Sequence, residues 1–341
     1  MGSPQVYFNN LFSKKNMPVN GWHRGAASPF RVMVRKEVGD HIRSWRFITM
    51  LLLILLTFLG AMYVSLENIR KVVANINDPD RIFVYLKLLT TSDNSLPTFH
   101  IFISFLGPLL GIALGFDAVN TEQNNGTLIR LMAQPVYRDN LLLAKFYGAL
   151  LVVSVLFFCL VLLMIGGGLI ITGVPLETTE LFRILAFIVL SIIYVGFWLS
   201  LAICLSVKFR HAATSALTAI GIWLFFTVFY QIIVNMVITA ILPDPASLQT
   251  EAVIAYNNII LSFLRIAPNQ LYTDAATTLL MPSVRSLGPL TMEQMAGAVP
   301  APLPFKESLM IVWPQVTGLV AATTACFALA YYLFMRKEIR T

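Results

Sequence analysis

The residues whose types and spacing can support a specific interaction are gathered in one polar segment, Glu122–Lys145. It lies between two long apolar runs, so the chain must leave an apolar environment and return within about twenty residues. Asn125-Gly126 predicts a turn, Thr127 can cap a short helix, and Pro135 would end that helix. The predicted apolar side of this helix consists of Leu128, Leu131 and Met132. An amphipathic hairpin of this kind predicts a docking surface; an ordinary connecting loop is the alternative.

Other kinds of chemistry find no support in the sequence. It contains no G-x-x-x-x-G-K-[ST] motif for ATP phosphates and no H-E-x-x-H motif for a metal. Its four histidines are scattered, and its three cysteines lie in apolar runs without ligand spacing, where packing is their simplest role. We therefore predict no catalytic residues, no metal site, no cofactor bound by this chain, and no enzyme activity of its own.

The composition is that of an integral membrane protein. Of the 341 residues, 57% are hydrophobic and 12% are charged, about half the charge of an average soluble protein. The apolar runs are long and continuous, which predicts an all-α membrane protein. The six predicted transmembrane helices are 47–66, 99–118, 146–172, 183–207, 212–242 and 312–334.

Three of these spans have features that predict their packing. The fifth is about thirty residues long, more than a perpendicular crossing needs, so we expect it to be tilted, kinked or extended. Gly107, Gly111 and Gly115 share one face of the second span and would let another helix approach closely. Gly166-Gly167-Gly168 in the third span predicts close packing, with a flexible hinge as the less favoured alternative.

The lysines and arginines predict the orientation. With the N-terminus inside, 16 of the 24 basic residues lie in inner segments, so both termini and Glu122–Lys145 are predicted to be cytoplasmic. This asymmetry explains the net charge of +7 without a nucleic-acid partner. Residues 1–29 are expected to form a cytoplasmic tail and 30–46 a basic amphipathic helix on the inner leaflet of the bilayer. Residues 47–341 form the six-helix domain.

The loop between the fifth and sixth spans, residues 243–311, is predicted to be an enlarged extracytoplasmic insert. It is rich in proline. Within it, Glu251–Arg265 has helical periodicity, and Ala267-Pro268 begins a second short helix that runs toward Met281. The insert is expected either to gate the outer mouth of a pathway, to contact a partner, or to be an inert cap.

The order of Glu122, Gly126-Thr127-Leu128, an apolar helix, Pro135, Arg138 and then Lys145 resembles the loop after the second helix in permeases of the type-2 ABC export family. In that family the segment is the coupling helix, which contacts a separate ATPase subunit. The resemblance covers roughly residues 100–240. It implies two ATPase subunits that hold the ATP and Mg, a second permease copy or a related permease, and a prokaryotic plasma membrane.

The resemblance also implies the residues that couple the two subunits, with Lys208-Phe209-Arg210-His211 as a second, shorter cytoplasmic contact. The predicted ATPase-coupling residues are Glu122, Gly126, Thr127, Leu128, Leu131, Pro135, Arg138, Lys208 and Arg210. Glu122 is expected to relay ATPase movement to the spans, to cap the short helix through its charge, or to do both. Arg138 and Lys145 have a second interpretation as inner-leaflet anchors.

The spans contain almost no ionisable residues at their centres, which argues against an ion-coupled carrier. A pathway lined by weakly polar groups would suit export of an amphipathic, lipidic or peptide-like substrate. The residues predicted to line it, or alternatively to form interhelical hydrogen bonds, are Ser104, Thr227, Tyr230, Gln231 and Asn235. The alternative function is a non-transporting ABC-linked component that transmits ATPase movement to an extracytoplasmic partner.

Overall fold

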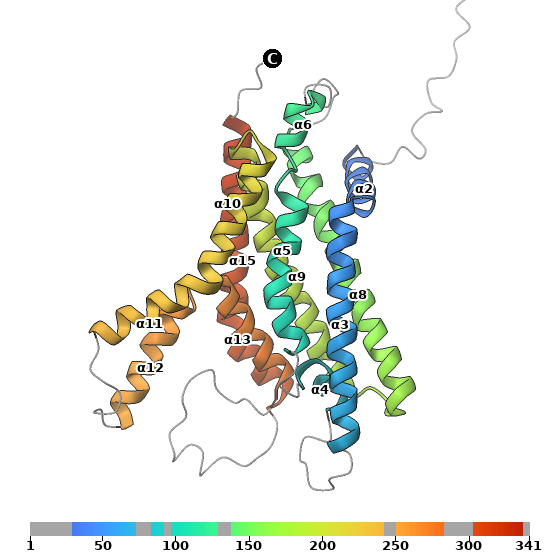
Figure 1. Ribbon diagram of the computed structural model, residues 1–341, viewed down its shortest axis with the longest axis vertical. Helices are drawn as coiled ribbons and strands as arrows, with labels where there is room; N and C mark the ends of the chain where they lie inside the picture. The colour runs from blue at the N-terminus through green and yellow to red at the C-terminus, as the bar shows by residue number, and fades with distance from the viewer. Residues whose placement is uncertain are drawn as a thin grey trace, which may run out of the picture.

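The computed structural model describes residues 29–72, 83–91, 97–128, 138–241, 250–282 and 303–336. In these ranges the chain is helical and contains no strand (Figure 1). Six helical stretches are long and apolar enough to cross a membrane, which confirms the predicted class and number of spans. They are α3 (Trp45–Val72), α5 (Phe99–Gly115) with α6 (Asn120–Asn124), α8 (Arg138–Thr172), α9 (Thr178–Lys208), α10 (Ala212–Leu224) with its continuation, and α15 (Phe305–Arg336).

The helices α5 and α9 form the buried centre of the bundle, and the predicted glycine stripe explains how close they lie. A Cβ atom built on Gly111 would lie 2.7 Å from the carbonyl oxygen of Val195, and one on Gly115 would lie 2.9 Å from that of Leu199. Real Cβ atoms do not approach backbone oxygens this closely. Glycine at these positions therefore permits the α5–α9 contact.

The helix α8 begins at Arg138, earlier than the predicted start at 146, because the polar residues before the apolar run continue the same helix. Near its far end, a Cβ on Gly168 would lie 2.7 Å from the Tyr85 ring of the short helix α4 (Val84–Thr90), and one on Gly167 would lie 2.7 Å from the Met62 methyl group. The helix is continuous through these glycines. The favoured interpretation, close packing, agrees with these contacts.

The basic helix before the first span is shorter than predicted. It forms α2 (Pro29–Ile42), and α3 begins separately at Trp45. The carbonyl of Ser44 accepts a hydrogen bond from the Ile48 amide at 3.1 Å, so Ser44 is in the N-cap position just before α3. The helix α2 packs against α8, where a Cβ on Gly148 would lie 2.9 Å from that of Glu37.

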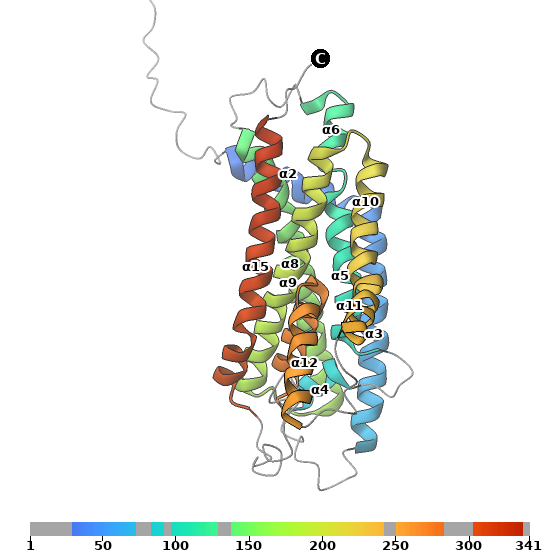
Figure 2. The same ribbon diagram turned by 90° about the vertical axis from the view of Figure 1, so that its left-hand side faces the viewer.

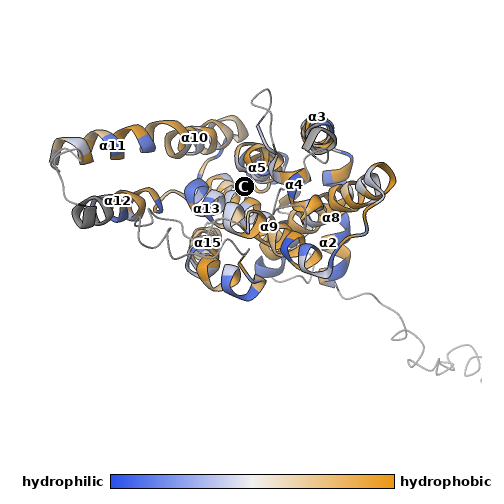
Figure 3. Ribbon diagram, turned by 90° about the horizontal axis from the view of Figure 1, so that it is seen from below, coloured by the Kyte–Doolittle hydropathy of each residue, from blue (hydrophilic) through white to orange (hydrophobic). Residues whose placement is uncertain are grey.

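The fifth span is bent, as its length predicts. After α10 the helix widens into a π-helical segment, η3 (Phe225–Phe229), and then continues as α11 (Tyr230–Ile241), which runs away from the bundle (Figures 1 and 3). The Tyr230 hydroxyl donates to the Phe263 carbonyl at 2.7 Å. The side chains of Val234, Ile238 and Tyr256 form a second, small apolar cluster between α11 and α12 (Thr250–Leu264).

The insert contains the two predicted helices, α12 and α13 (Pro268–Leu280). The helix α13 is not a peripheral cap, because its Tyr272, Ala275 and Ala276 side chains are buried against α9 and α15. The last span begins at Phe305, so the first residues of α15 lay within the predicted insert. The remaining predicted insert residues, 243–249 and 283–302, lie outside the described ranges, as do residues 1–28 of the predicted tail.

One buried arginine joins these elements at the end of the bundle that holds α4. Arg183, near the start of α9, donates to the Leu279 carbonyl at 3.0 Å, the Ser308 hydroxyl at 3.1 Å and the Leu303 carbonyl at 2.5 Å. The opposite end of the bundle holds α2, α6 and the end of α15 (Figure 2). We call it the α6 end.

Candidate functional site

The second span leads directly into the predicted polar segment at the α6 end. The hydroxyl of Ser206, near the end of α9, accepts hydrogen bonds from the amides of Val119 at 3.0 Å and Asn120 at 3.2 Å. These bonds hold the start of α6 against α9. After α6 the chain turns at Gly126, whose φ of +69° is a left-handed conformation that favours glycine. The predicted turn at Asn125-Gly126 is therefore confirmed.

The second predicted contact segment lies next to the first. The Asn124 side-chain amide donates to the Arg210 carbonyl at 2.9 Å, so the connection after α9 touches the end of α6. Lys208 is exposed, and its ammonium lies 5.9 Å from the centroid of the Phe209 ring. The described part of the first predicted segment and the second predicted segment are thus in contact at the α6 end.

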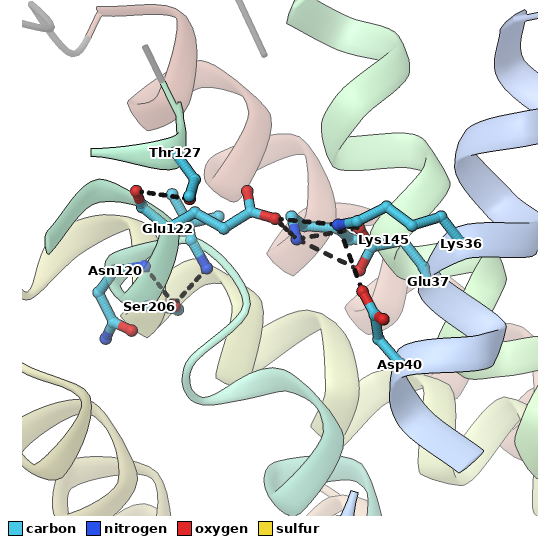
Figure 4. Close-up of polar contacts among 9 residues, drawn as sticks. Lys36, Glu37, Asp40, Asn120, Glu122, Thr127, Lys145 and Ser206 are labelled. Carbon is cyan, nitrogen blue, oxygen red and sulfur yellow. Dashed lines mark hydrogen bonds and ion pairs between the residues drawn. The ribbon is translucent and has the colours of Figure 1, made fainter. Parts of the chain in front are cut away.

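Glu122 lies in the first turn of α6 and is part of a cluster of ionised side chains from three helices (Figure 4). One of its carboxylate oxygens accepts a hydrogen bond from the Lys145 ammonium of α8 at 2.8 Å. Lys145 also lies 3.3 Å from both carboxylate oxygens of Glu37 on α2. Lys36 contacts Glu37 at 3.0 Å, Asp40 at 3.3 Å and Glu122 at 3.6 Å. We call these five residues the ion cluster.

Burial and neighbouring charges shift the pKa values of Glu37 and Lys36 in opposite directions. Burial disfavours the ionised form of Glu37, but the ammonium groups of Lys145 and Lys36 outweigh it and lower the pKa of Glu37. Partial burial lowers the pKa of Lys36, but the negative charges of Glu37, Glu122 and Asp40 have the larger combined effect, and the pKa of Lys36 is raised. Lys36 and Glu37 are therefore both ionised at neutral pH, and their contacts with Lys145 and Glu122 hold α2, α6 and α8 together.

A second ion pair joins the same segment to the first span. The Arg46 guanidinium at the start of α3 pairs with Asp117 in the turn after α5. It also lies 4.7 Å from the centroid of the Phe116 ring. The segment that follows α5 is thus held by ionic contacts to α2, α3 and α8, and its backbone amides donate hydrogen bonds to the Ser206 hydroxyl of α9.

The remaining predicted coupling residues have different surroundings. Leu128, which was predicted to lie on the apolar side of the short helix, is buried within the chain. Thr127 was predicted to cap the short helix that follows it. In the structure its hydroxyl donates instead to the carbonyl of Glu122, in the preceding helix α6, at 3.1 Å. Arg138 is exposed at the first residue of α8. Leu131 and Pro135 lie in 129–137, outside the described residues.

The structure does not bring the predicted pathway residues together. Ser104 hydrogen-bonds through its hydroxyl to Thr273 of α13 at 3.2 Å, in line with the alternative of interhelical hydrogen bonding. Gln231 and Asn235 are exposed on α11, which turns away from α5. Thr227 is half-buried in η3, where the π-helical turn breaks the four-residue spacing that would place it on their face. Tyr230 donates to the Phe263 carbonyl of α12, as described above.

Lys145 belongs to the predicted segment, but its contact with Glu122 and the part played by Lys36 and Glu37 were not predicted from the sequence. Glu37 follows Val34 by three residues and precedes Val38, so it lies on the apolar side of an otherwise basic helix. A lone acid in that position is a signal for a buried ion pair, because an isolated carboxylate there would be costly. No group of three or more potential metal ligands occurs in the described part of the chain.

Six helices long and apolar enough to cross a membrane, with a charged segment held at one end, are the architecture of an integral membrane protein. A family model described as ABC-2 family transporter protein matches residues 31–339. The chain belongs to this family. It is a membrane permease subunit of an ABC system, and the family implies an ABC ATPase as its partner.

Two curated relatives carry the name probable ABC transporter permease protein NosY. The protein of Stutzerimonas stutzeri is 32% identical over 135 residues, which cover 38% of this chain and 47% of that protein. The protein of Pseudomonas aeruginosa is 28% identical over 206 residues, which cover 59% of this chain and 67% of that protein. The chain thus matches about half the length of the first relative and two thirds of the second.

Proposed function

We propose that the α6 end faces the cytoplasm and is the surface to which an ABC ATPase subunit docks. The docking surface would comprise the segment from Glu122 to Arg138 and the connection from Lys208 to His211. The observation that carries this proposal is the ion cluster, in which Glu122 is bonded to both α2 and α8 through Lys145 and Lys36. A segment fastened in this way passes a displacement to the spans instead of absorbing it.

The structure of α6 also offers groups that an ATPase surface can use. The buried oxygens Asn120 Oδ1 and Gln123 Oε1 have no hydrogen-bond partner among the described residues. Unpaired buried acceptors are costly, and donors from a partner would remove that cost. Binding of ATP to the partner subunits would then favour one arrangement of the spans, because coupling requires different affinities for two states.

In the complete transporter we propose two ATPase subunits and two permease chains, either identical or related. ATP and Mg would be bound by the ATPase subunits. The cargo we propose is an amphipathic, lipidic or peptide-like molecule that is exported across a prokaryotic plasma membrane. The support is compositional: the spans are apolar, and the buried charges Lys145, Glu180 and Arg183 lie toward helix ends and not at mid-membrane.

The test is co-purification with the candidate ATPase followed by ATP hydrolysis in lipid nanodiscs. We expect Glu122→Ala to keep the complex assembled but to lose most of the membrane-dependent activity. Glu307→Ala serves as a matched control, because Glu307 is exposed at the first turn of α15, at the opposite end of the bundle. Glu122→Gln, which keeps the side-chain volume, separates loss of charge from loss of packing. Unchanged activity in both Glu122 variants would contradict the proposal.

A second function is favoured by the position of α13. This helix is buried within the bundle and fixed through Leu279 to Arg183, so α13 would move with the spans. The chain would then transmit ATPase movement to an extracytoplasmic partner without moving cargo. ATPase activity that depends on such a partner, in vesicles that accumulate no substrate, would distinguish this function from export.

A further inference from the structure

A polar cavity of about 550 Å³ lies at the α6 end, between α2, α3, α5, α6 and α8. The ion cluster forms part of its wall. Its ionisable lining residues are four acids, three basic side chains and one histidine: Glu37, Asp40, Asp117, Glu122, Arg43, Arg46, Lys145 and His41. The remainder of the lining comprises Ser44, Trp45, Thr121 and three apolar residues of α5 and its following turn.

The charges of this cavity are only partly paired with one another. Arg43 is exposed and has no ion pair among the described residues. Glu122 Oε2 has no hydrogen-bond partner there. Asp40 is exposed and contacts Lys36 at 3.3 Å, which leaves carboxylate capacity free. The cavity thus offers both a free cationic group and free anionic groups to a ligand.

The charges around the cavity balance, which favours a ligand that carries both charges over a purely anionic one. Burial lowers the pKa of His41, so this side chain is neutral at pH 7. The four acids of the lining are matched by its three basic side chains together with Lys36, which contacts Glu37, Asp40 and Glu122 from outside the lining. A ligand that carries only negative charge would be attracted by Arg43 and Arg46 but repelled by the acids behind them. A ligand with both charges would satisfy both sets of groups.

The cavity lies where a bilayer places its headgroups. Trp45 lines it and is also the first residue of the first span, with 79% of its surface exposed. Tryptophan at the end of a span is typical of the membrane–water interface. Farther along α3, an exposed apolar stripe offers a surface for acyl chains: Leu52, Leu56 and Leu59.

We propose that this cavity binds the headgroup of a zwitterionic phospholipid with a primary ammonium, such as phosphatidylethanolamine. Arg43 and Arg46 hold the phosphate at the rim. Asp40 and Glu122 accept hydrogen bonds from the ammonium. A choline headgroup has no N–H to donate, and a glycerol headgroup has no cation. The proposal follows from the membrane location alone and does not depend on docking of an ATPase.

The test measures lipid binding to the full chain in detergent, without any ATPase. Delipidated protein is titrated with phosphatidylethanolamine, phosphatidylcholine or phosphatidylglycerol of matched acyl chains, and bound lipid is counted by native mass spectrometry. We expect phosphatidylethanolamine to bind most tightly. Soluble phosphoethanolamine forms a further arm, in which we expect no binding at millimolar concentration, since it cannot contact α3.

Two single variants and one matched control locate the site. Arg43→Gln should weaken phosphatidylethanolamine binding about tenfold, the usual effect of losing one charge-assisted hydrogen bond. Asp40→Asn should narrow the preference for phosphatidylethanolamine over phosphatidylglycerol. Arg35→Gln removes an exposed cation of α2 that does not line the cavity, and should change neither.

Three results would overturn the proposal. The first is equal binding of all three lipids, and the second is binding that Arg43→Gln and Asp40→Asn leave unchanged. The third is binding of soluble phosphoethanolamine as tight as that of the lipid, which would identify a site for a water-soluble phosphoamine. A folded state that survives each substitution, checked by thermal unfolding, is required for each comparison.

Discussion

Replacement of Lys145 by methionine should destabilise the protein far more than the same replacement at Lys36. Both lysines contact the same two acids, Glu37 and Glu122. The Lys145 side chain is 5% exposed, and its removal leaves two carboxylates, 9% and 15% exposed, without the ammonium between them. Breaking a buried ion pair by removing one partner costs about 3–5 kcal/mol. Because Lys36 remains nearby, we expect a loss of about 3 kcal/mol.

Lys36→Met is the matched control. Its side chain is 48% exposed, and exposed ion pairs contribute less than about 1 kcal/mol because water screens them. The free energy of unfolding would be measured at pH 7 in mixed micelles by titration with dodecyl sulfate, followed by tryptophan fluorescence. The double variant Lys145→Met/Glu37→Gln should recover part of the loss, because it removes one of the two carboxylates left facing each other.

Equal losses in the two lysine variants would refute this reasoning, because burial would then not decide the strength of the contacts. A loss below about 1 kcal/mol in Lys145→Met would refute it as well, since such a value belongs to an exposed pair. A double variant less stable than Lys145→Met would show that Glu37 is held by something other than the ion cluster.

Three further predictions concern single positions. Gly111→Ala should lower the free energy of unfolding by about 1–3 kcal/mol, because the added Cβ would lie 2.7 Å from a backbone oxygen of α9. Gly166→Ala on α8, where the Cβ would meet no atom within 4 Å, should change it little in the same titration. The contribution of Glu37 should be complete above its ordinary pKa of 4.5 and lost as the pH falls through its lower folded-state pKa, so Glu37→Gln should remove this part of the acid dependence of unfolding. Arg183→Met leaves three acceptors at the α4 end without their donor and should destabilise by about 2–4 kcal/mol, while Lys306→Met at an exposed neighbouring site should change stability by less than about 0.5 kcal/mol.

Features that depend on local sequence could be predicted. The six spans follow from hydropathy, the turn at Gly126 from its Asn-Gly pair, and the helix beginning at Pro268 from the preference of proline for a first turn. The glycine stripe of α5 predicted a close helix contact, although not that α9 would be the partner. In each case the physical cause lies within a few residues of the feature.

Features that depend on distant residues could not be predicted. Glu37 and Lys145 are 108 positions apart, and nothing in the sequence around either residue indicates that the two are in contact. In the sequence Arg183 is only the first residue of a predicted span. Its three acceptors belong to α13, to α15 and to Leu303 just before α15. The bend of the fifth span was expected from length alone. Its location at η3 coincides with bonds from Asn269 to the Phe226 carbonyl and from Tyr230 to α12, which sequence spacing does not indicate.

The close α5–α9 contact has a mechanical consequence. With 31 residues, α9 is about 46 Å long, and the glycines of α5 leave no soft side-chain layer between the two backbones. Ser206 fixes one end of α9 to the start of α6, and Arg183 fixes the other end to α13 and α15. We therefore expect α5 and α9 to move together as one rigid unit. Tilting it by about 5° about one end would displace the other by about 4 Å, on the opposite side of the membrane.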